Sequence, residues 1–522
     1  MTTTPAEQSL ARDFGVLTDL VRAHAERDPR HLALVDSARS LDYGALDALM
    51  DRIAAALQRD GVAPGEAIAV CAASSALYAA VFLGALRAGV AVAPLAPGAT
   101  PASLARMVED ARARCLFVDA ANAGGFEQVD ARQVLRVALD ASPVGVALDD
   151  WLAPAGARPA AVVPDPAAPF NIIYSSGTTG EPKGIVQPHS MRWAHVRRGT
   201  TYGYGPDGTT LLATPLYSNT TLVVFFPTIA WGGTVVLMEK FDAAGYLRLA
   251  EQHRPTHTML VPVQYQRLMA LPDFDAHDLR SFRFKFSTSA PFGAALKADV
   301  LARWPGGLVE FYGMTEGGGT CILEAHLQPD KLYTVGRPSE GHDIRLIDES
   351  GREVAAGEAG EVVGASPSMM TGYHRQPGKT REAEWFDPSG KRFIRTGDVG
   401  RFDADGFLTL HDRRKDMVIS GGFNIYPSDL EAVLAQHPDV AEAAVIAAPS
   451  AQWGETPVAF VVLRPGAPAS ADALKAWANQ RLGKTQRLAA LHLVGELPRS
   501  AIGKVLKRDL RELHLALSPH KD

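Results

Sequence analysis

Residues 67–95 of the chain read AIAVCAASSALYAAVFLGALRAGVAVAPL. Short apolar runs fill 67–72 and 90–95, as expected of buried strands. Between them, 75–88 carries apolar side chains at helical spacing and is followed by Gly89, a residue typical of helix C-caps. A strand, a helix and a second strand in succession favour a βαβ unit. The stretch therefore predicts an α/β fold in which helices cover parallel or mixed sheets.

The same alternation extends on both sides of this stretch. Helical spacing recurs upstream at 17–25 and 46–57, and strand-like and helical segments alternate again over 210–301. No repeat of fixed period accompanies them. These segments predict one large N-terminal domain.

The pattern changes towards the C-terminus. After about residue 341, short alternating segments with turns such as Asp405-Gly406 predict a small β-rich part. From about residue 412, helical and strand-like segments predict a smaller α+β domain of about 100 residues. We therefore predict an N-terminal domain over 1–411 and a C-terminal domain over 412–522.

Composition excludes several classes of protein. The 522 residues are 47% hydrophobic and 21% charged, which is ordinary for a globular chain, and the net charge of −6 gives no general basic field for nucleic acid. Residues 1–14 show no secretory pattern, and no long apolar run predicts a membrane span. The three cysteines are too few for a disulfide framework, so we expect buried thiols. These features predict a cytoplasmic protein without nucleic-acid or integral membrane contact.

A glycine- and hydroxyl-rich segment is the strongest candidate for a binding site. It reads Ser175-Ser176-Gly177-Thr178-Thr179-Gly180-Glu181-Pro182-Lys183-Gly184 and follows an apolar run. Backbone N–H groups at glycines, four hydroxyls and one ammonium suit a polyphosphate. Pro182 and Gly184 break the Walker template. The alternative is a polar hairpin turn.

A second glycine pattern matches a dinucleotide-binding motif but is not expected to bind a dinucleotide. Gly203, Gly205 and Gly208 match G-x-G-x-x-G. The pattern precedes a predicted strand instead of following one, so a plain turn is favoured over a dinucleotide site.

The segment 175–184 resembles the phosphate-binding signature of the adenylate-forming superfamily, which includes acyl-CoA synthetases, adenylation domains of peptide synthetases and luciferases. Further segments resemble the family's motifs in the same order along the chain: 84–95, 311–316, 395–398, 412–416 and 498–504. Each string is weak alone, but their order and spacing together make chance a poor explanation. The chain is most similar to the acyl-CoA synthetase branch, the AMP-dependent acid:CoA ligases.

The resemblance implies roles for the segment at 312–316. Tyr312, with Gly313 beside it, would stack on adenine, Thr315 would contact phosphate, and Glu316 would help to hold Mg²⁺. A carboxylate is a suitable ligand for that ion, with nucleotide oxygens and water completing its shell. The alternative is a surface turn after a buried strand.

The resemblance also assigns roles towards the C-terminus. Asp398 would accept hydrogen bonds from the ribose hydroxyls, and Arg413 would reach the ribose or phosphate side of the nucleotide. Lys415 stands at the family's hinge, about which the small domain rotates. Lys504 would bridge the carboxylate and the α-phosphate during adenylation. Without the resemblance, Asp398 would be an aspartate in a turn and Lys504 an exposed loop lysine. Arg413 and Lys415 would belong to a solvated run of charged residues.

A hairpin resembles the one that serves the second half-reaction in CoA ligases. Gly421, Gly422 and Phe423 form its tip, and glycine would let the pantetheine thiol pass close to the backbone. A tight β-turn is the alternative, and both descriptions can hold together.

The segment that opens the acyl pocket in this family corresponds to Tyr217, Ser218 and Asn219. Many relatives carry His where this chain has Ser218. Their substrate preference therefore does not carry over directly to this chain. No Asp occurs over 213–229 to pair an α-ammonium, so an amino acid is disfavoured. We expect a short, aryl or hydroxylated acid.

The resulting hypothesis is an AMP-forming carboxylic acid:CoA ligase that uses ATP, Mg²⁺ and coenzyme A, with a small-molecule acid as its partner. A stand-alone adenylation enzyme that loads a carrier protein is one alternative. A non-catalytic scaffold that senses ATP or AMP is another. The sequence leaves the oligomeric state open, a homodimer included.

Overall fold

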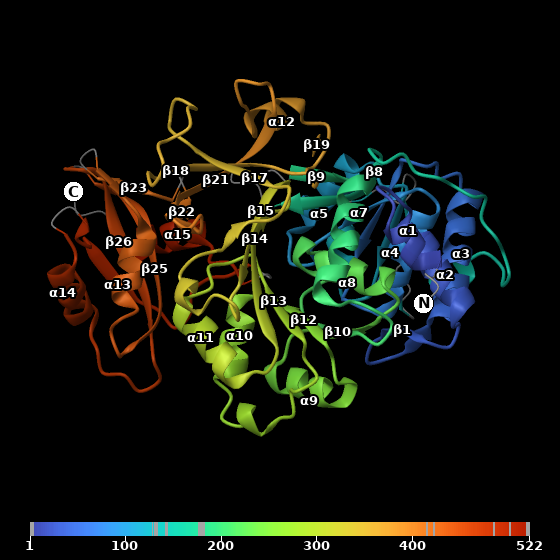
Figure 1. Ribbon diagram of the computed structural model, residues 1–522, viewed down its shortest axis with the longest axis horizontal. Helices are drawn as coiled ribbons and strands as arrows, with labels where there is room; N and C mark the ends of the chain where they lie inside the picture. The colour runs from blue at the N-terminus through green and yellow to red at the C-terminus, as the bar shows by residue number, and fades with distance from the viewer. Residues whose placement is uncertain are drawn as a thin grey trace. The chain divides into compact units, whose positions relative to one another are not determined.

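The computed structural model describes residues 5–127, 129, 134–140, 145–175, 183–413, 416–420, 423–450, 452–483, 486–500 and 503–517 (Figure 1). The βαβ unit is present as β3 (Ala67–Cys71), α4 (Ala76–Arg87) and β4 (Ala91–Pro94), and the two strands pair in parallel. Ser75 caps α4 by accepting a hydrogen bond from the Tyr78 amide at 3.2 Å. Gly89 follows the helix with φ of 73°. The prediction from this stretch is confirmed.

This unit lies within an eight-stranded sheet of order β19-β9-β8-β4-β3-β5-β6-β7. Its core strands are parallel, and β9 pairs antiparallel with both β8 and β19 at one edge. The remaining strands of the sheet are β5 (Cys115–Val118), β6 (Leu135–Ala138), β7 (Val146–Ala147), β8 (Pro169–Ser175), β9 (Lys183–Pro188) and β19 (Gly372–Tyr373).

A second large sheet has the order β16-β15-β14-β13-β12-β10-β11-β1-β2 and is also mostly parallel. It contains β1 (Leu32–Val35), β2 (Ser40–Asp42), β10 (Thr209–Leu212), β11 (Thr234–Leu237), β12 (His257–Leu260), β13 (Phe284–Ser287), β14 (Gly307–Met314), β15 (Gly317–Glu324) and β16 (Arg337–Pro338). The pattern at 203–208 precedes β10 and contains turns, as the sequence predicts.

Helices pack against both sheets. They are α1 (Pro5–Leu10), α2 (Leu17–Arg27), α3 (Tyr43–Arg59), α5 (Pro101–Asp110), α6 (Leu148–Trp151), α7 (His189–Arg197), α8 (Asn219–Ala230), α9 (Ala243–His253), α10 (Pro262–Met269) and α11 (Ala294–Arg303). Short 3₁₀ segments include η2 (Arg198–Tyr202), which continues α7.

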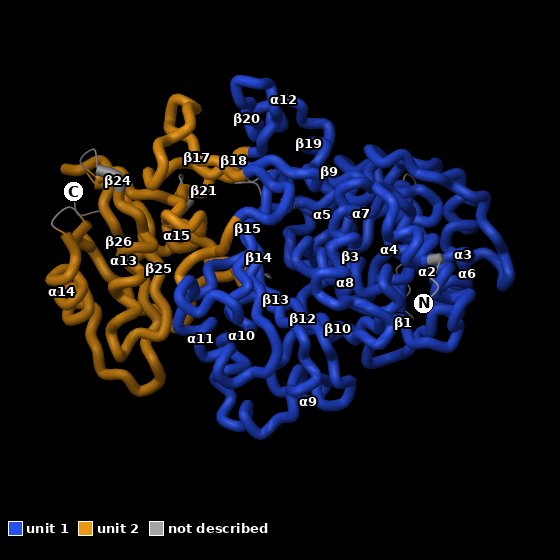
Figure 2. The backbone as a smooth tube through the Cα atoms, viewed as in Figure 1, with its two compact units in different colours: residues 1–332, 338–343, 364–394 blue, residues 333–337, 344–363, 395–522 orange. Residues whose placement is uncertain are grey.

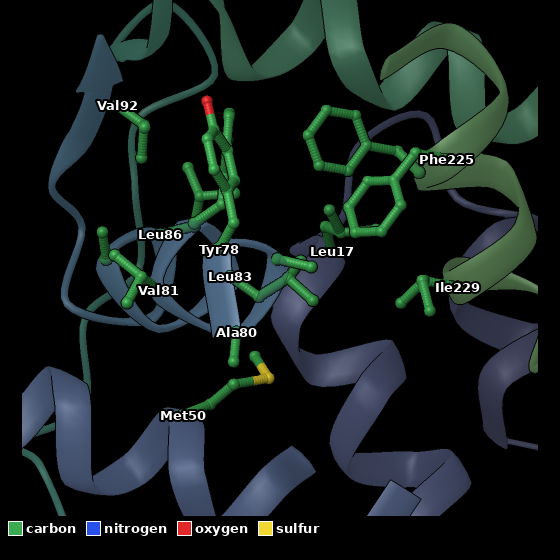
Figure 3. Packing of buried hydrophobic residues seen from close by; sticks show 14 of the residues in the cluster. Leu17, Met50, Tyr78, Ala80, Val81, Leu83, Leu86, Val92, Phe225 and Ile229 are labelled. Atoms are coloured by element: carbon green, nitrogen blue, oxygen red, sulfur yellow. The ribbon is translucent and has the colours of Figure 1, made fainter. Parts of the chain in front are cut away.

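One buried apolar cluster joins helices α2, α3, α4 and α8 to strands of both large sheets. Figure 3 shows Leu17, Met50, Leu83, Phe225 and Ile229 among the side chains packed in this cluster. The two sheets are therefore parts of one core.

The three cysteines, Cys71, Cys115 and Cys321, are buried free thiols, and burial raises the pKa of Cys71 and of Cys115 to about 12. The expected buried thiols are confirmed.

Downstream of these sheets, a five-stranded sheet has the order β17-β18-β21-β20, with β22 also paired to β21. Its elements are β17 (Asp343–Ile347), β18 (Gly360–Ala365), β20 (Glu384–Phe386), β21 (Arg392–Phe402) and β22 (Leu408–Arg413), with α12 (Pro377–Glu382) between β19 and β20. This is the predicted β-rich part.

The C-terminal segment forms a separate five-stranded sheet of order β24-β23-β26-β25, with β27 paired to β26. Helices accompany this sheet, as expected for an α+β arrangement. Its elements are β23 (Val418–Ser420), β24 (Phe423–Ile425), α13 (Pro427–Leu434), β25 (Val440–Ser450), β26 (Gly454–Leu463), α14 (Ala471–Arg481), β27 (Ala490–Leu493) and α15 (Lys507–Leu517). A separate apolar cluster lies between this sheet and α13 and α14.

The chain divides into two compact units, shown in blue and orange in Figure 2. Unit 1 comprises 1–332, 338–343 and 364–394, and unit 2 comprises 333–337, 344–363 and 395–522. The predicted division into 1–411 and 412–522 stays a prediction. Across the described part of the chain, no helix has both the length and the apolar character needed to cross a bilayer.

The close crossing of α3 and α4 depends on a glycine. A Cβ built on Gly84 would lie 2.7 Å from Cβ of Ile53, well inside van der Waals contact. We expect Gly84→Val to lower the free energy of unfolding by about 1–3 kcal/mol, because the helices would have to separate. Gly98, with no atom within 4 Å of its built Cβ, provides the control Gly98→Val. Thermal unfolding of both variants tests this, and equal midpoints would contradict it.

Candidate active site

The predicted phosphate loop is anchored by an antiparallel strand pair. Strand β8 ends at Ser175 and β9 begins at Lys183, and these two residues are partners in the ladder. Ser176, Gly177, Thr178, Thr179 and Gly180 lie outside the described residues. The structure thus places the two ends of the segment. Lys183, the basic residue of the segment, lies at one of these ends.

Tyr373 connects Lys183 to Glu316. The Lys183 Nζ lies 5.2 Å from the centroid of the Tyr373 ring, and the Tyr373 hydroxyl donates a hydrogen bond of 2.9 Å to Glu316 Oε1. Burial, followed by the charge of Glu316, raises the pKa of Tyr373, so the phenol stays a neutral donor. Two residues predicted from separate motifs therefore meet on one tyrosine.

The turn that carries Thr315 and Glu316 is tightly constrained. It joins β14 to β15, and Gly317 begins β15 at φ of 80°. A Cβ on Gly317 would lie 2.0 Å from the carbonyl oxygen of Ser368, so only glycine fits. The Met370 amide donates to the Glu316 carbonyl at 2.8 Å. Tyr312 and Gly313, the predicted adenine-binding residues, lie in β14 just before this turn.

A buried glutamine links this turn to the predicted acyl segment. Gln187, at the far end of β9, donates from Nε2 to the Thr315 carbonyl at 2.6 Å and to Asn219 Oδ1 at 3.3 Å. Gln187 is fully buried. The structure thus brings the predicted phosphate-contacting and substrate-binding segments together through one amide.

The predicted acyl segment forms the start of α8. Ser218 is the N-cap and accepts from the Thr220 amide at 3.3 Å, while Asn219 is the first helical residue. Tyr217 precedes the cap and is half-buried, and burial raises its pKa. The Thr220 hydroxyl lies 2.6 Å from the hydroxyl of Ser289, whose backbone has φ of 80°. A non-glycine residue held in that conformation is characteristic of functional loops.

Three of these residues, Gln187, Ser289 and Tyr373, belong to none of the sequence motifs. Each acts on a residue far away in the chain. For Tyr373 the separation from Glu316 is 57 residues. A local pattern carries no signal of such contacts.

Unit 2 brings together the two predicted ribose-side residues. Asp398 on β21 and Arg413 on β22 are direct partners in the antiparallel ladder. The Asp398 amide donates to the Thr396 hydroxyl at 3.0 Å, and that hydroxyl donates to the Val362 carbonyl at 2.8 Å. The side chain of Arg413 lies outside the described part of the chain. The backbone alone places the two residues opposite each other.

Lys504 lies next to an antiparallel bridge between Arg499 and Val505 in unit 2. The Ser500 amide donates to the Lys504 carbonyl at 2.8 Å, and the Lys504 amide donates to the Ser500 hydroxyl at 3.2 Å. Gly503, at φ of 75°, makes the turn, and Arg499 donates to its carbonyl at 2.7 Å. The loop holds the lysine by its backbone.

The predicted hairpin for coenzyme A is described at its flanks. Ser420 on β23 pairs with Phe423 on β24 in an antiparallel ladder. Gly421, Gly422 and the predicted hinge, Lys415, lie outside the described residues.

The donor set around Glu316 suits a hard cation that brings its own ligands. No group of three or more His, Cys, Asp or Glu side chains that could hold a metal ion occurs among the described residues. Tyr373 occupies Oε1 of Glu316. One carboxylate with nucleotide oxygens and water is a common shell for Mg²⁺.

Two family models match the chain over most of its length. The "AMP-binding enzyme" family matches residues 21–374, and the "AMP-binding enzyme C-terminal domain" matches residues 429–504. The chain belongs to the AMP-binding enzyme family, as the motifs predicted.

The chain is similar over most of its length to known ligases. It is 33% identical to a feruloyl-CoA synthase from Amycolatopsis sp., over 93% of this chain and 96% of the relative. It is 30% identical to the fatty acid–[acyl-carrier-protein] ligase ScoC of Streptomyces coeruleorubidus, over 94% of each. The crystal structure of ATP-bound MatB from Rhodopseudomonas palustris superimposes with a TM-score of 0.85 at 29% identity, covering 96% of this chain and 99% of that one.

The hydrogen bond from Tyr373 predicts a change in metal dependence. In Tyr373→Phe the ring stays beside Lys183, but Glu316 loses the donor that orients it. We expect the Mg²⁺ concentration for half-maximal adenylation to rise about tenfold or more, as for loss of other residues that orient a metal ligand. Pyrophosphate release at varied Mg²⁺ measures this, with the exposed Tyr333→Phe as the control. An unchanged Mg²⁺ requirement would show that the bond does not serve the metal.

Proposed function

We propose that the chain is an AMP-forming carboxylic acid:CoA ligase. In the first half-reaction a carboxylate oxygen attacks the α-phosphorus of ATP and pyrophosphate leaves. In the second, the thiol of coenzyme A attacks the acyl carbonyl of the acyl-AMP and AMP leaves. Protein groups can help both steps mainly by positioning the reactants and stabilising charge on oxygen.

The contact of Tyr373 with both Lys183 and Glu316 is the observation that carries this proposal. Lys183 supplies an ammonium to the polyphosphate, and Glu316 is the ligand for Mg²⁺. When bound, Mg²⁺ neutralises charge on phosphate oxygens. Thr315 follows in the same turn, and Gln187 ties that turn to Asn219 at the acyl segment.

Further roles follow from the family's motifs. Ser175, Ser176, Gly177, Thr178, Thr179 and Gly180 cradle the phosphates, and Tyr312 with Gly313 binds adenine. Asp398 accepts from the ribose hydroxyls, with Arg413 beside it, and the ladder pairing of the two supports this. Lys504 stabilises charge that develops on the carboxylate and the α-phosphate.

The second half-reaction uses the hairpin at 421–423. Gly421 and Gly422 leave room for the pantetheine arm, and Phe423 flanks it. Rotation about Lys415 exchanges this hairpin with Lys504 after adenylation, because a few backbone dihedrals can absorb a domain rotation.

The acid is short, aryl or hydroxylated. Tyr217, Ser218 and Asn219 offer an aromatic ring and polar groups at the start of α8, and a relative named for an aryl acid supports the aryl option. The protein acts in the cytoplasm on a small molecule, and its oligomeric state stays open, a homodimer included.

Loading of a carrier protein is the second candidate function. The similarity to an acyl-carrier-protein ligase favours it. A sensing scaffold is disfavoured, because a sensor needs no counterpart of Lys504. All three share the nucleotide site. The two enzymes differ in what accepts the acyl group, and the scaffold transfers none.

A pyrophosphate-release screen over a panel of carboxylic acids tests the proposal. Each active acid is then offered coenzyme A or a phosphopantetheinylated carrier protein, and the thioester is identified by mass spectrometry. We expect thioester with free coenzyme A. Thioester on the carrier alone would favour the second candidate, and no release with any acid would favour the sensor.

The role of Lys504 predicts a selective defect. We expect Lys504→Ala to slow acyl-AMP formation about 10²–10³-fold, as for loss of one preorganised donor. Conversion of supplied acyl-AMP to thioester should fall much less. Lys475→Ala, on α14 of the same unit, is the control. An equal loss in both half-reactions would indicate a folding defect and contradict the assigned role.

A further inference from the structure

Four basic side chains gather inside unit 1, and none of the described residues gives them an acidic partner. Arg192 and His195 lie on α7, Arg198 opens η2, and His342 lies in the segment before β17. We call these residues the basic cluster. The structure gives none of the four an ion pair with Asp or Glu in the described part of the chain. A buried cation without a counter-charge is costly, so the cluster needs an explanation.

Arg192 shows the imbalance most clearly. It is 1% exposed, and its Nε donates to Asn171 Oδ1 at 2.9 Å while one terminal nitrogen donates to Gln187 Oε1. The other terminal nitrogen, Nη1, is buried with no acceptor. The guanidinium lies 5.5 Å from the centroid of the Phe226 ring. Burial lowers the pKa of Arg192 to about 9.

Arg198 and His342 face each other as two donors. The Thr320 amide donates to His342 Nδ1 at 2.9 Å, so the neutral imidazole carries its proton on Nε2. Nε2 is the atom that meets the terminal nitrogen of Arg198, which can only donate. Two donors in contact need an acceptor, and the described residues place none between them.

His195 completes the basic cluster. Its Nδ1 is buried without a partner. Burial comes first among the causes that lower the pKa of His195, followed by the charges of Arg192, Arg198 and His342. Arg192, Arg198 and His342 therefore all act on His195. His195, Arg198 and His342 are half-buried, so none of them is sealed completely in the core.

The basic cluster adjoins the proposed acyl site. Helices α7 and α8 are packed side by side (Figure 1). The Gln187 side chain that accepts from Arg192 donates to Thr315 and Asn219, at the phosphate turn and the acyl segment. On the other side, His342 is held by Thr320 of β15, the strand that begins directly after the Glu316 turn.

A purely structural role fits the cluster poorly. Elsewhere in unit 1 a buried arginine is matched by acids: Arg87 lies 2.6 Å from Asp47 and 2.9 Å from Asp51. The basic cluster has no such match among the residues described, although it holds two arginines. Buried Lys285 also lacks an acid in the described part of the chain but is satisfied by three backbone carbonyls, whereas Arg198 and His342 face each other as donors, so an anionic ligand would satisfy both.

We propose that the basic cluster binds a second anionic group, a carboxylate or a sulfonate, on the acid substrate. This inference rests on the proposed acid:CoA ligase function and names the class of acid. The reacting carboxylate meets ATP, while the distal anion accepts hydrogen bonds from Arg198 and from Nε2 of His342. His195 links this pair to Arg192, whose charge also acts on His195. Such an anion satisfies the facing donors and supplies the counter-charge.

Matched acids test the proposal in the wild-type protein. Succinate and 3-sulfopropanoate are compared with butanoate, and isophthalate with benzoate, by kcat/KM for pyrophosphate release. We expect the dianionic member of at least one set to be preferred by about 30-fold or more, as for a buried charge pair. Equal or better turnover of the singly charged acid in every set would overturn the inference. If no acid releases pyrophosphate, the proposed function itself fails.

Variants of Arg198 test whether this residue discriminates between dianionic and singly charged acids. We expect Arg198→Met to reduce the dianion-to-monoanion preference by at least 30-fold and Arg198→Lys to restore part of it. The control is Arg197→Met, since Arg197 is an exposed neighbour that pairs with Asp13 at 3.6 Å. Calorimetric titration of the acids without ATP should show the same loss in affinity. An equal effect of Arg198→Met on both classes of acid, or no effect, would overturn the assignment.

Discussion

The antiparallel pairing of β9 with β8 and β19 is the constraint on which the candidate site depends. It fixes Lys183 opposite Ser175, at the ends of the phosphate segment, and sets β19 with Tyr373 beside them. The other end of the same strand carries Gln187, which reaches the phosphate turn and the acyl segment. A six-residue strand thus organises three segments that the chain supplies from distant positions.

Local physics made part of this organisation predictable. The βαβ unit at 67–95 follows from apolar periodicity and from Gly89, both of which act within a few residues. The segment with Lys183 is recognisable by its glycines and hydroxyls, and the one with Thr315 and Glu316 by its resemblance to a family motif. The residues that join them, Gln187 and Tyr373, were not found, because a hydrogen bond across the fold leaves no periodic trace in the sequence.

The contrast between local motifs and long-range contacts also explains how far the sequence predicts the substrate. The segment at 217–219 indicated polarity near the acyl group but gave no charge. The basic cluster is built from two neighbouring residues on α7, one on η2 and one 144 positions after Arg198. In the sequence, Arg197 and Arg198 form an ordinary charged pair. Only the fold shows that one is exposed and the other faces His342.

Transfer of oxygen from the acid to the nucleotide tests the central claim most directly. An acid labelled with ¹⁸O in its carboxylate is incubated with ATP, Mg²⁺ and coenzyme A, and the products are analysed by mass spectrometry. If a carboxylate oxygen attacks the α-phosphorus, it leaves with AMP when the thioester forms, so AMP should carry one ¹⁸O and pyrophosphate none. Label in inorganic phosphate or pyrophosphate, or unlabelled AMP alongside thioester, would contradict an acyl-AMP intermediate.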